Sequence, residues 1–401
     1  MRPPTPSQLA EQAEFDLLLG CARTRLKDGD EDGFSDLVGQ GIDGQRLLRA
    51  AGRHGLVPLL HRHCRESHAE LLSAELWEEA EEYVRDSTRR NLLLASELAR
   101  LLAQFEQEGV KVAPYKGPVL AAELYGNLAL RSYCDLDLLI DRRDLSRAEE
   151  VLRAQGYVPE ISLTEAEQEK WLKENCERNF NGVDGLSHVE LHWAIIPPRF
   201  GVSLDVVSMI SRCRATPFSG KPVPTLTPED MLLVLCAHGF KHFWGRLFWI
   251  CDVAELIRVH PDLDWEVAIE RAERSHCRRM LWLGLALAGK LLGAQLPERA
   301  REAIESDRIV ADLVRRSEQW LRKGPAAPRS RLAEAQYALR GGERFRDRAP
   351  MWRYFRERVF RPNEKDRAWL KLPRPLGFLY WLLRPLRLLR DYGFRRGNRS
   401  E

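Results

Sequence analysis

The chain has 401 residues, enough for two or three domains, and its 44% hydrophobic and 30% charged residues are typical of a globular protein rather than a disordered one. The formal net charge of +3 does not by itself indicate nucleic acid as a partner. The excess of basic residues lies in the tail from Lys371 onward, and no recognition motif for nucleic acid accompanies it.

The cysteines and the apolar segments indicate the cellular compartment of the protein. The eight cysteines are scattered and form no CxxC pair, so we expect reduced, mostly buried thiols rather than a disulfide framework. Acidic residues precede the first apolar run, unlike in a signal peptide. The apolar run from Leu376 to Leu383 is too short to span a bilayer. These features predict a cytoplasmic protein.

The spacing of apolar residues predicts helices in the first part of the chain and strands after it. Leucines and alanines recur at spacings of three and four over residues 8 to 107. The β-prone run at 110–115 ends in Lys116-Gly117 and leads into a helix-like stretch. The alternating segment SYCDLDLLID predicts a second strand. Asp144 is a candidate cap for the helix that follows, and Gly156 ends that helix.

The next segment completes a small α+β unit. A polar helix is expected at 164–174, and Asp184-Gly185 between two strand-like runs is a hairpin signal. The second arm, SHVELHWAI, alternates again. We therefore predict an α+β fold with a mixed-sheet core between helical regions. The expected boundaries are 1–107 for an N-terminal helical region, 108–226 for the core, 227–322 for a helical domain that completes the site, and 323–401 for a basic C-terminal helical segment.

Helices are expected again beyond the core. Thr227-Pro228 is a helix start, with threonine as the N-cap and proline in the first turn, and it leads the run MLLVLCAHGF. The periodicity predicts further helices at 246–259, 264–276, 279–293 and 297–321.

Asp135 and Asp137 are the clearest candidates for chemistry. Alternate side chains of a strand share a face, so the two carboxylates point the same way. They repel each other unless water or a cation lies between them. Mg²⁺ favours such a site, with a few carboxylates and the remaining ligands from water and phosphate. A solvated strand edge without a ligand explains the same pair.

Two further features favour a phosphate-binding metal site. Lys116 and Gly117 lie where a strand meets a helix, and glycine lets backbone N–H groups approach a phosphate while the lysine adds charge. Glu190, in SHVELHW, can supply the third carboxylate that two-metal phosphoryl transfer requires. The lysine–glycine pair alone is equally consistent with an ordinary strand-to-helix turn.

Taken together, these motifs carry a family resemblance. Tyr-Lys-Gly, LAAELYG, Arg131, DLDLLI and VELHW follow one another, and the pattern continues into LTPEDMLLVLCAHGFKHFWGRLFWICDVAEL. Over about residues 85 to 290, the chain resembles the uncharacterised nucleotidyltransferase family of the polymerase-beta superfamily. The resemblance implies an enzyme that moves a nucleotidyl group from an NTP to a hydroxyl-type acceptor, with two Mg²⁺ ions.

The resemblance also implies roles for individual residues. Asp135 and Asp137 would bind the metals with Glu190 as the third carboxylate, and the triphosphate would contact Lys116, Gly117 and Arg131. Pro118 departs from the Gly-Gly or Gly-Ser of the wider superfamily and removes one N–H donor. That departure favours an alternative function, a nucleotide-binding module of the same fold without turnover.

The helix after Thr227 carries a cluster of polar residues on an otherwise apolar segment. His238, Lys241 and His242 share one helix face because they are spaced by three and four residues. We interpret them, with Arg246, as a nucleotide-binding cationic wall over the carboxylates. Lys241 and Arg246 would face the outer phosphates, and Asp252 would orient one of these two cations. An ion-paired helical hairpin without a ligand is the alternative.

A zinc site is a further alternative. His188, Glu190 and His192 share a strand face, and H-x-E-x-H can bind Zn²⁺. The two aspartates and the lysine turn favour oxygen-bound Mg²⁺ instead.

The C-terminal segment 372–399 reads as a basic amphipathic helix interrupted at Pro385. Such a helix can lie on an anionic membrane surface, which would make the protein a peripheral membrane protein working through its tail. The other interpretation, which we prefer slightly, is a terminal helix that packs its apolar face on the body and exposes its arginines.

Overall fold

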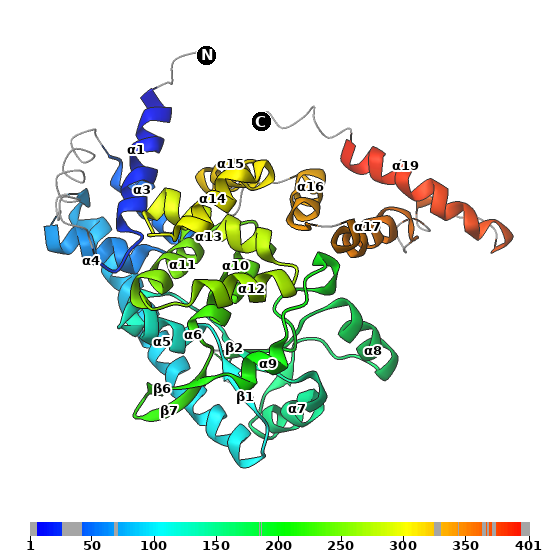
Figure 1. The fold of residues 1–401 in the computed structure, drawn as a ribbon, viewed down its shortest axis with the longest axis horizontal. Helices are drawn as coiled ribbons and strands as arrows, with labels where there is room; N and C mark the ends of the chain where they lie inside the picture. The colour runs from blue at the N-terminus through cyan, green and yellow to red at the C-terminus, as the bar shows by residue number, and fades with distance from the viewer. Residues whose placement is uncertain are drawn as a thin grey trace.

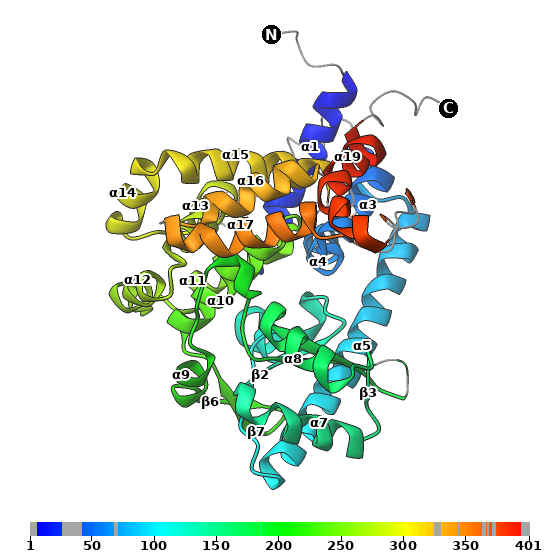
Figure 2. The ribbon, with the colours of Figure 1, turned by 90° about the vertical axis from the view of Figure 1, so that its right-hand side faces the viewer.

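The computed structural model describes residues 6–25, 42–67, 71–183, 185, 187–324, 330–343, 345–362, 366, 369–370 and 374–393. A five-stranded mixed sheet lies among helices from both the N-terminal and the C-terminal parts of the chain (Figure 1, Figure 2). The α+β fold class predicted from the sequence is therefore confirmed.

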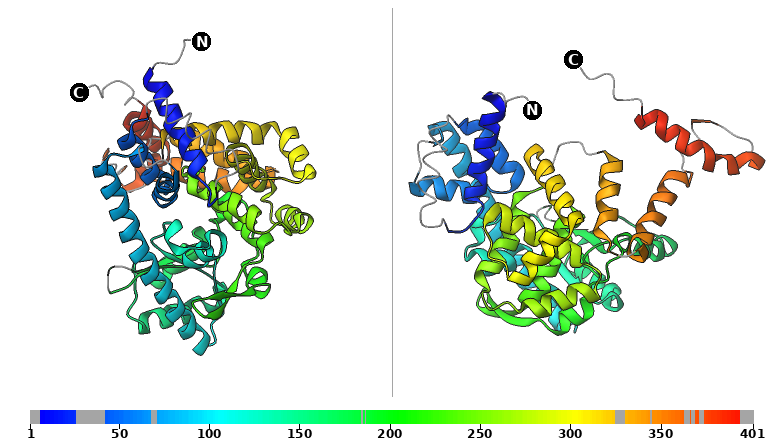
Figure 3. Two further views of the ribbon diagram at one scale, coloured as in Figure 1. Left: turned by 90° about the vertical axis from the view of Figure 1, so that its left-hand side faces the viewer. Right: turned by 45° about the horizontal axis from the view of Figure 1, so that its top comes forward.

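One long helix connects the N-terminal helices with the sheet. The helices of this region are α1 (Pro6–Cys21), α3 (Gly44–His54), α4 (Val57–Ser67) and α5 (Ala74–Gln107). Ser73 caps α5 by accepting from the N–H of Leu76, and α5 then runs along one side of the molecule (Figure 3). Ala80 packs in the core shared with the N-terminal helices, whereas the segment from Leu94 to Phe105 packs in the core of the sheet. Helix α5 therefore belongs to both cores.

The sheet has the order β1-β2-β5-β4-β3. Its strands are β1 (Val112–Pro114), β2 (Leu136–Ile140), β3 (Val158–Pro159), β4 (Glu177–Asn181) and β5 (His188–His192). Strands β2 and β5 are parallel, and the other neighbours are antiparallel. Every residue of β2 is buried, so its polar side chain Asp137 lies inside the protein.

Short helices connect these strands. They are α6 (Gly117–Leu120), the π-helical turn η2 (Ala121–Tyr125), the 3₁₀ turns η3 (Leu128–Leu130) and η4 (Arg142–Asp144), α7 (Leu145–Ala154) and α8 (Glu165–Glu174). The predicted cap of α7 was wrong: Asp144 makes no side-chain cap, and Asp141 instead caps η4 through the N–H of Arg143. The hairpin prediction is confirmed by the β4–β5 pairing, although Asp184 lies outside the described residues.

A second hairpin follows the sheet and was not predicted. The turn η5 (Pro198–Phe200) and α9 (Val206–Ser211) lead to β6 (Arg214–Phe218) and β7 (Lys221–Thr225). Pro217 pairs with Pro222, and Ala215 pairs with Pro224. Prolines usually argue against a strand because they donate no hydrogen bond, but a two-stranded ribbon has free edges that tolerate them.

The helices that follow β7 form the helical domain. Its helices are α10 (Pro228–Lys241), α11 (Leu247–Val259), α12 (Trp265–Arg274), α13 (Arg278–Leu292), α14 (Glu298–Ser306) and α15 (Arg308–Lys323). Thr227 caps α10 as predicted. The single helix expected at 297–321 is divided, because the Asp307 side chain accepts from the N–H groups of Ile309 and Val310 and so starts α15. The buried Trp244 ring packs on Gly239 and Gly284, where a Cβ would lie 2.5 Å and 3.0 Å from the ring, and this packing fixes the turn between α10 and α11.

The C-terminal part consists of α16 (Arg331–Gly341), α17 (Phe345–Phe360), the 3₁₀ turn η6 (Arg374–Leu379) and α19 (Tyr380–Gly393). Helix α19 lies at the periphery beside α17 (Figure 1). The predicted interruption at Pro385 was wrong, because α19 continues through this proline. Arg384 and Arg387, on either side of it, are both bound to Asp366, and this anchoring offsets the lost backbone hydrogen bond.

Candidate active site

The turn from β1 into α6 brings Lys116 to the edge of the sheet. Gly117 has φ +58°, a left-handed conformation that side chains rarely adopt, and a Cβ there would lie 3.1 Å from the carbonyl oxygen of Asp135. The glycine therefore allows the turn to pack directly on the residue before β2. Pro118 occupies the first turn of α6, where an N–H has no intrahelical acceptor.

Two of the predicted acids lie side by side because of strand register. In the parallel β2–β5 pair, Asp137 is directly opposite Glu190. The Asp137 side chain is 1% exposed and that of Glu190 is 19% exposed, so this acidic pair lies at the boundary between core and solvent. Asp135 precedes β2 and is half-buried. The fold thus places Asp137 and Glu190 side by side, and Asp135 lies near enough for its charge to interact with both.

Lys116 and His192 compensate the buried charge of Asp137. Lys116 Nζ lies 2.8 Å from Asp137 Oδ1, and His192 Nε2 lies 3.1 Å from the same oxygen and 3.0 Å from Glu190 Oε2. Burial opposes ionisation of Asp137, but Lys116 and His192 outweigh it and hold its pKa below the usual range. The pKa of Glu190 is also lowered: burial again opposes ionisation, and the nearby imidazoles of His188 and His192 outweigh it.

Asp135 has no such compensation. Burial and the negative charge of Asp137 raise the pKa of Asp135 from 3.8 to about 6. The attraction of Lys116 only partly offsets these effects. A carboxylate destabilised in this way gains from a nearby cation, so Asp135 is the acid of this centre most in need of one.

Sequence reasoning missed Glu177 and the importance of His192. Glu177 Oε2 lies 3.4 Å from His192 Nδ1, so the imidazole lies between Glu177 on one side and Asp137 and Glu190 on the other. Residues 177 and 192 are paired across the β4–β5 hairpin. Counting outward from the Asp-Gly turn would have identified this pair.

The cationic wall predicted on α10 requires correction. Lys241 Nζ is 2.8 Å from Glu177 Oε2, so its charge is directed at that carboxylate rather than at an open site. Burial, followed by repulsion from Lys241 and Lys116, lowers the pKa of His242 to about 3. Burial and the charge of Lys116 also lower the pKa of His238. Both imidazoles are therefore neutral near pH 7. They lie beside Lys116, whose Nζ is 3.5 Å from His238 Nδ1.

The interpretation of Asp252 as a partner of Lys241 or Arg246 was also wrong. Asp252 accepts two hydrogen bonds of 2.9 Å from Arg131 and one of 2.7 Å from Tyr125, and all three residues are buried. This network ties α11 to the segment between β1 and β2. It also engages Arg131, which the resemblance assigned to nucleotide binding.

Arg246 differs from Lys241, because no acid among the described residues neutralises its charge. Its side chain is exposed, forms no ion pair with any of the described residues, and lies 6.0 Å above the Trp249 ring. Burial and the neighbouring acids raise the pKa of Cys134, next to Asp135, to about 11, and the charge of Arg246 partly offsets this shift. Arg246 therefore lies near the segment that leads into β2. The rings of Trp249 and His242 pack on each other in the same region, with 5.2 Å between their centroids.

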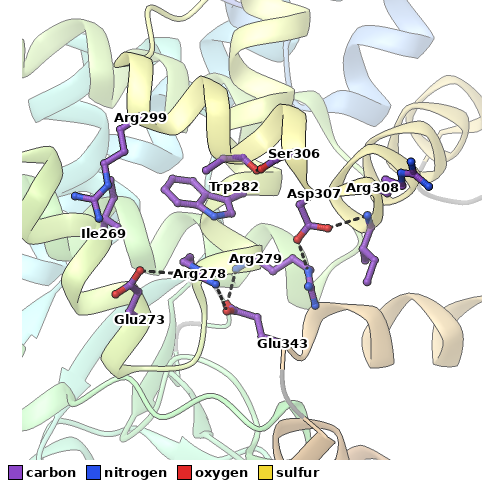
Figure 4. Close-up of a pocket in the computed structure, with 12 residues that line it drawn as sticks. Ile269, Glu273, Arg278, Arg279, Trp282, Arg299, Ser306, Asp307, Arg308 and Glu343 are labelled. Carbon is purple, nitrogen blue, oxygen red and sulfur yellow. Dashed lines mark hydrogen bonds and ion pairs between the residues drawn. The ribbon is translucent and has the colours of Figure 1, made fainter.

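One cavity lies away from the carboxylate centre. A cavity of about 600 Å³ between α12 and α15 is lined by charged residues that largely pair with one another (Figure 4). Arg279 Nε lies 2.9 Å from Asp307, and Arg278 lies 3.1 Å from Glu343. This cavity shares no residue with the carboxylate centre.

Comparison with known protein families gives one match. A family model described as an uncharacterised nucleotidyltransferase matches residues 40–293, well over half of the chain. The chain belongs to this family. The membership confirms the resemblance predicted from the motifs and indicates nucleotidyl transfer, with an NTP as substrate. No curated protein and no solved structure matches the chain. The matched residues include all three acids, Lys116 and Arg246, and the match ends before α14.

Proposed function

We propose that the protein transfers a nucleotidyl group from an NTP to a hydroxyl-type acceptor at the centre formed by Asp135, Asp137 and Glu190. The observation that carries the proposal is the register of β2 and β5, which sets Asp137 opposite Glu190 beside the Lys116-Gly117 turn. In such a transfer the acceptor oxygen bonds to the α-phosphorus, the bond to the β-phosphate oxygen breaks, and pyrophosphate leaves.

The residues present fit a divalent metal. Three carboxylates converge here, and in the metal-free state a lysine and a histidine supply the positive charge at Asp137. Oxygen-rich sites with a few carboxylates are what Mg²⁺ prefers, with water and phosphate as the remaining ligands. A bound divalent cation would neutralise the phosphate charge that develops during transfer.

The side chains of this centre can then act directly on the substrates. Lys116 Nζ lies 2.8 Å from Asp137 Oδ1 and 3.5 Å from His238 Nδ1, and it would be free to turn toward the phosphates if a metal neutralised Asp137 in its place. The half-buried Glu190 is the acid of this centre that could accept the proton of the acceptor hydroxyl; because its pKa is lowered, it would do so only if a bound metal also lowered the pKa of that hydroxyl. The sequence assigned contact with the outer phosphates to both Lys241 and Arg246; we propose that Arg246 alone of these two has this role, because Lys241 is paired with Glu177.

Arg246→Ala is expected to weaken NTP binding about tenfold and NMP binding hardly at all, because one charge-assisted contact to the outer phosphates is lost. Isothermal titration with both nucleotides measures the difference. Arg274→Ala is the matched control, since Arg274 is an exposed arginine of α12 that pairs with Glu270. Equal weakening for NTP and NMP would count against the phosphate role.

The transfer itself is tested with each α-labelled NTP, Mg²⁺ or Mn²⁺, and a cell extract as the source of acceptors. The proposal predicts a labelled product whose size and chemistry identify the acceptor class. Binding of NTP without any labelled product would instead favour a nucleotide-binding module without turnover, the alternative to which Pro118 points.

A second function, attachment to an anionic membrane, is favoured by the surface of α19 and η6. Phe378, Trp381, Leu382 and Leu386 are 48–65% exposed, whereas Arg384 and Arg387 are buried against Asp366. The preferred prediction of an apolar face packed on the body with exposed arginines is therefore reversed for these residues. Arg395, Arg396 and Arg399 lie outside the described residues. None of the described helices has the length and apolarity needed to cross a bilayer, so we propose attachment at the surface.

The double variant Trp381→Ser/Leu382→Ser is expected to lose binding to phosphatidylserine-containing vesicles at least tenfold in co-sedimentation. Leu92→Ser/Leu93→Ser is the matched control, because these two leucines of α5 are also about half exposed, at 55% and 52%. Equal binding by wild type and both variants would contradict attachment through this face.

A further inference from the structure

His192 is placed as a metal ligand would be. Its side chain is 2% exposed, and Nε2 lies within 3.1 Å of both Asp137 and Glu190. The candidate ligand atoms of these three residues all lie within 4.8 Å of one another. One cation could therefore contact all three, with only small movements of their side chains.

The second ring nitrogen of His192, Nδ1, lies near a carboxylate. His192 Nδ1 faces Glu177 Oε2 at 3.4 Å, and Lys241 holds that carboxylate at 2.8 Å. The His192 ring also packs edge-on against Tyr115, with 5.3 Å between centroids. Histidines that bind metals usually direct their second nitrogen at a carboxylate, which fixes the ring and the tautomer. Glu177 lies on that side of the ring, and the buried Nδ1 has no hydrogen-bond partner among the described residues, so Glu177, at 3.4 Å, would accept from Nδ1 after a small movement.

We propose that His192 is a metal ligand together with Asp137 and Glu190, that Glu177 positions it, and that the site consequently prefers Mn²⁺ to Mg²⁺. The inference rests on the proposed function, because the same centre would bind the metal of the transfer reaction. Mg²⁺ favours oxygen ligands, whereas imidazole increases affinity for transition-metal ions. Replacing one oxygen ligand by a nitrogen shifts the selectivity in that direction.

The opposite side of the ring is a weaker candidate. Cys176, Glu177 and His192 also form a group of possible ligands. Lys241 Nζ, however, already lies 2.8 Å from Glu177 and 3.7 Å from Cys176 Sγ, and there is one carboxylate for it to neutralise. On the Nε2 side the carboxylates of Asp137 and Glu190 lie together, and Lys116 is in contact with Asp137, so two acids share one lysine there.

Electron spin echo measurements on the full-length protein with Mn²⁺ alone test the inference. The wild type is expected to show the modulation of a directly coordinated ¹⁴N, and to bind Mn²⁺ at least tenfold more tightly than Mg²⁺ in calorimetry. His192→Asn should lose the modulation and most of that preference. His188→Asn is the matched control: His188 lies 3.6 Å from Glu190 on the same strand, but it is bound to Asn181 at 2.8 Å. This variant should keep both properties.

Two outcomes of these measurements would overturn the role of His192, and a third would count against the proposed function. Mn²⁺ binding without ¹⁴N modulation in the wild type would overturn the role of His192 while leaving the proposed transfer intact. Loss of modulation in His188→Asn but not in His192→Asn would transfer the role to His188 and overturn the proposal. Absence of any Mn²⁺ or Mg²⁺ binding, also with NTP present, would count against the proposed function itself. If His192→Asn fails to fold, the wild-type and His188→Asn spectra still decide between these outcomes.

Discussion

Asp137→Asn is expected to lower nucleotidyl transfer by at least about a thousandfold, because it removes the buried charge around which the metal, Lys116 and His192 are arranged. The same change should destabilise the metal-free protein by about 3 kcal/mol, since Lys116 and His192 would then be left without their common partner. Initial rates with labelled NTP and denaturant unfolding measure the two effects.

Asp141→Asn is the matched control for that variant. Asp141 follows the same strand but lies beyond its other end, where it caps a 3₁₀ turn. Transfer by Asp141→Asn should stay near the wild-type rate. An Asp137→Asn protein that keeps more than a tenth of the wild-type rate would show that Asp137 is not at the reacting centre.

Asp135→Asn is expected to have the opposite effect on stability. The folded-state pKa of Asp135 is about 6, above the ordinary value of 3.8, so its ionised form is unfavourable in the folded protein. That cost is absent below pH 3.8, grows as the pH rises to about 6, and is complete above it. Asparagine removes it, so the metal-free variant should be about 2 kcal/mol more stable than the wild type at pH 7.5.

Unfolding in guanidinium between pH 4 and pH 8, with a chelator present, tests this expectation. The advantage of Asp135→Asn over the wild type should shrink toward zero as the pH approaches 4. With Mn²⁺ added, the wild type should gain more stability than the variant, because a cation relieves the repulsion that the variant lacks. A variant less stable than the wild type at pH 7.5 without metal would contradict this account of Asp135.

The sequence allowed prediction of those features that local patterns determine. Thr227 and Pro228 gave the start of α10, and the alternating runs gave β2 and the β4–β5 hairpin. Strand periodicity predicted that Asp135 and Asp137 share a face, and the structure sets Asp137 opposite Glu190, whereas Asp135 precedes β2. Both β6 and β7 were missed because prolines mask their strand character.

Pairing between distant residues could not be predicted from local patterns. Lys241 and Glu177 are 64 positions apart, and Arg131 and Asp252 are 121 apart, so only the tertiary fold reveals which charges neutralise each other. The same applies to His242, whose neutrality results from burial and from two nearby lysines. Composition could likewise not reveal that Arg384 and Arg387 turn inward to Asp366.

Anomalous diffraction from crystals of the protein with Mn²⁺ and a non-hydrolysable NTP analogue tests the central claim most directly. The account predicts a manganese peak in contact with the carboxylates of Asp137 and Glu190, with the α-phosphate of the analogue bound to the same ion and Lys116 turned toward the phosphates. A peak at Cys176 and Glu177 instead, or an analogue bound with no manganese at the carboxylates of β2 and β5, would contradict it.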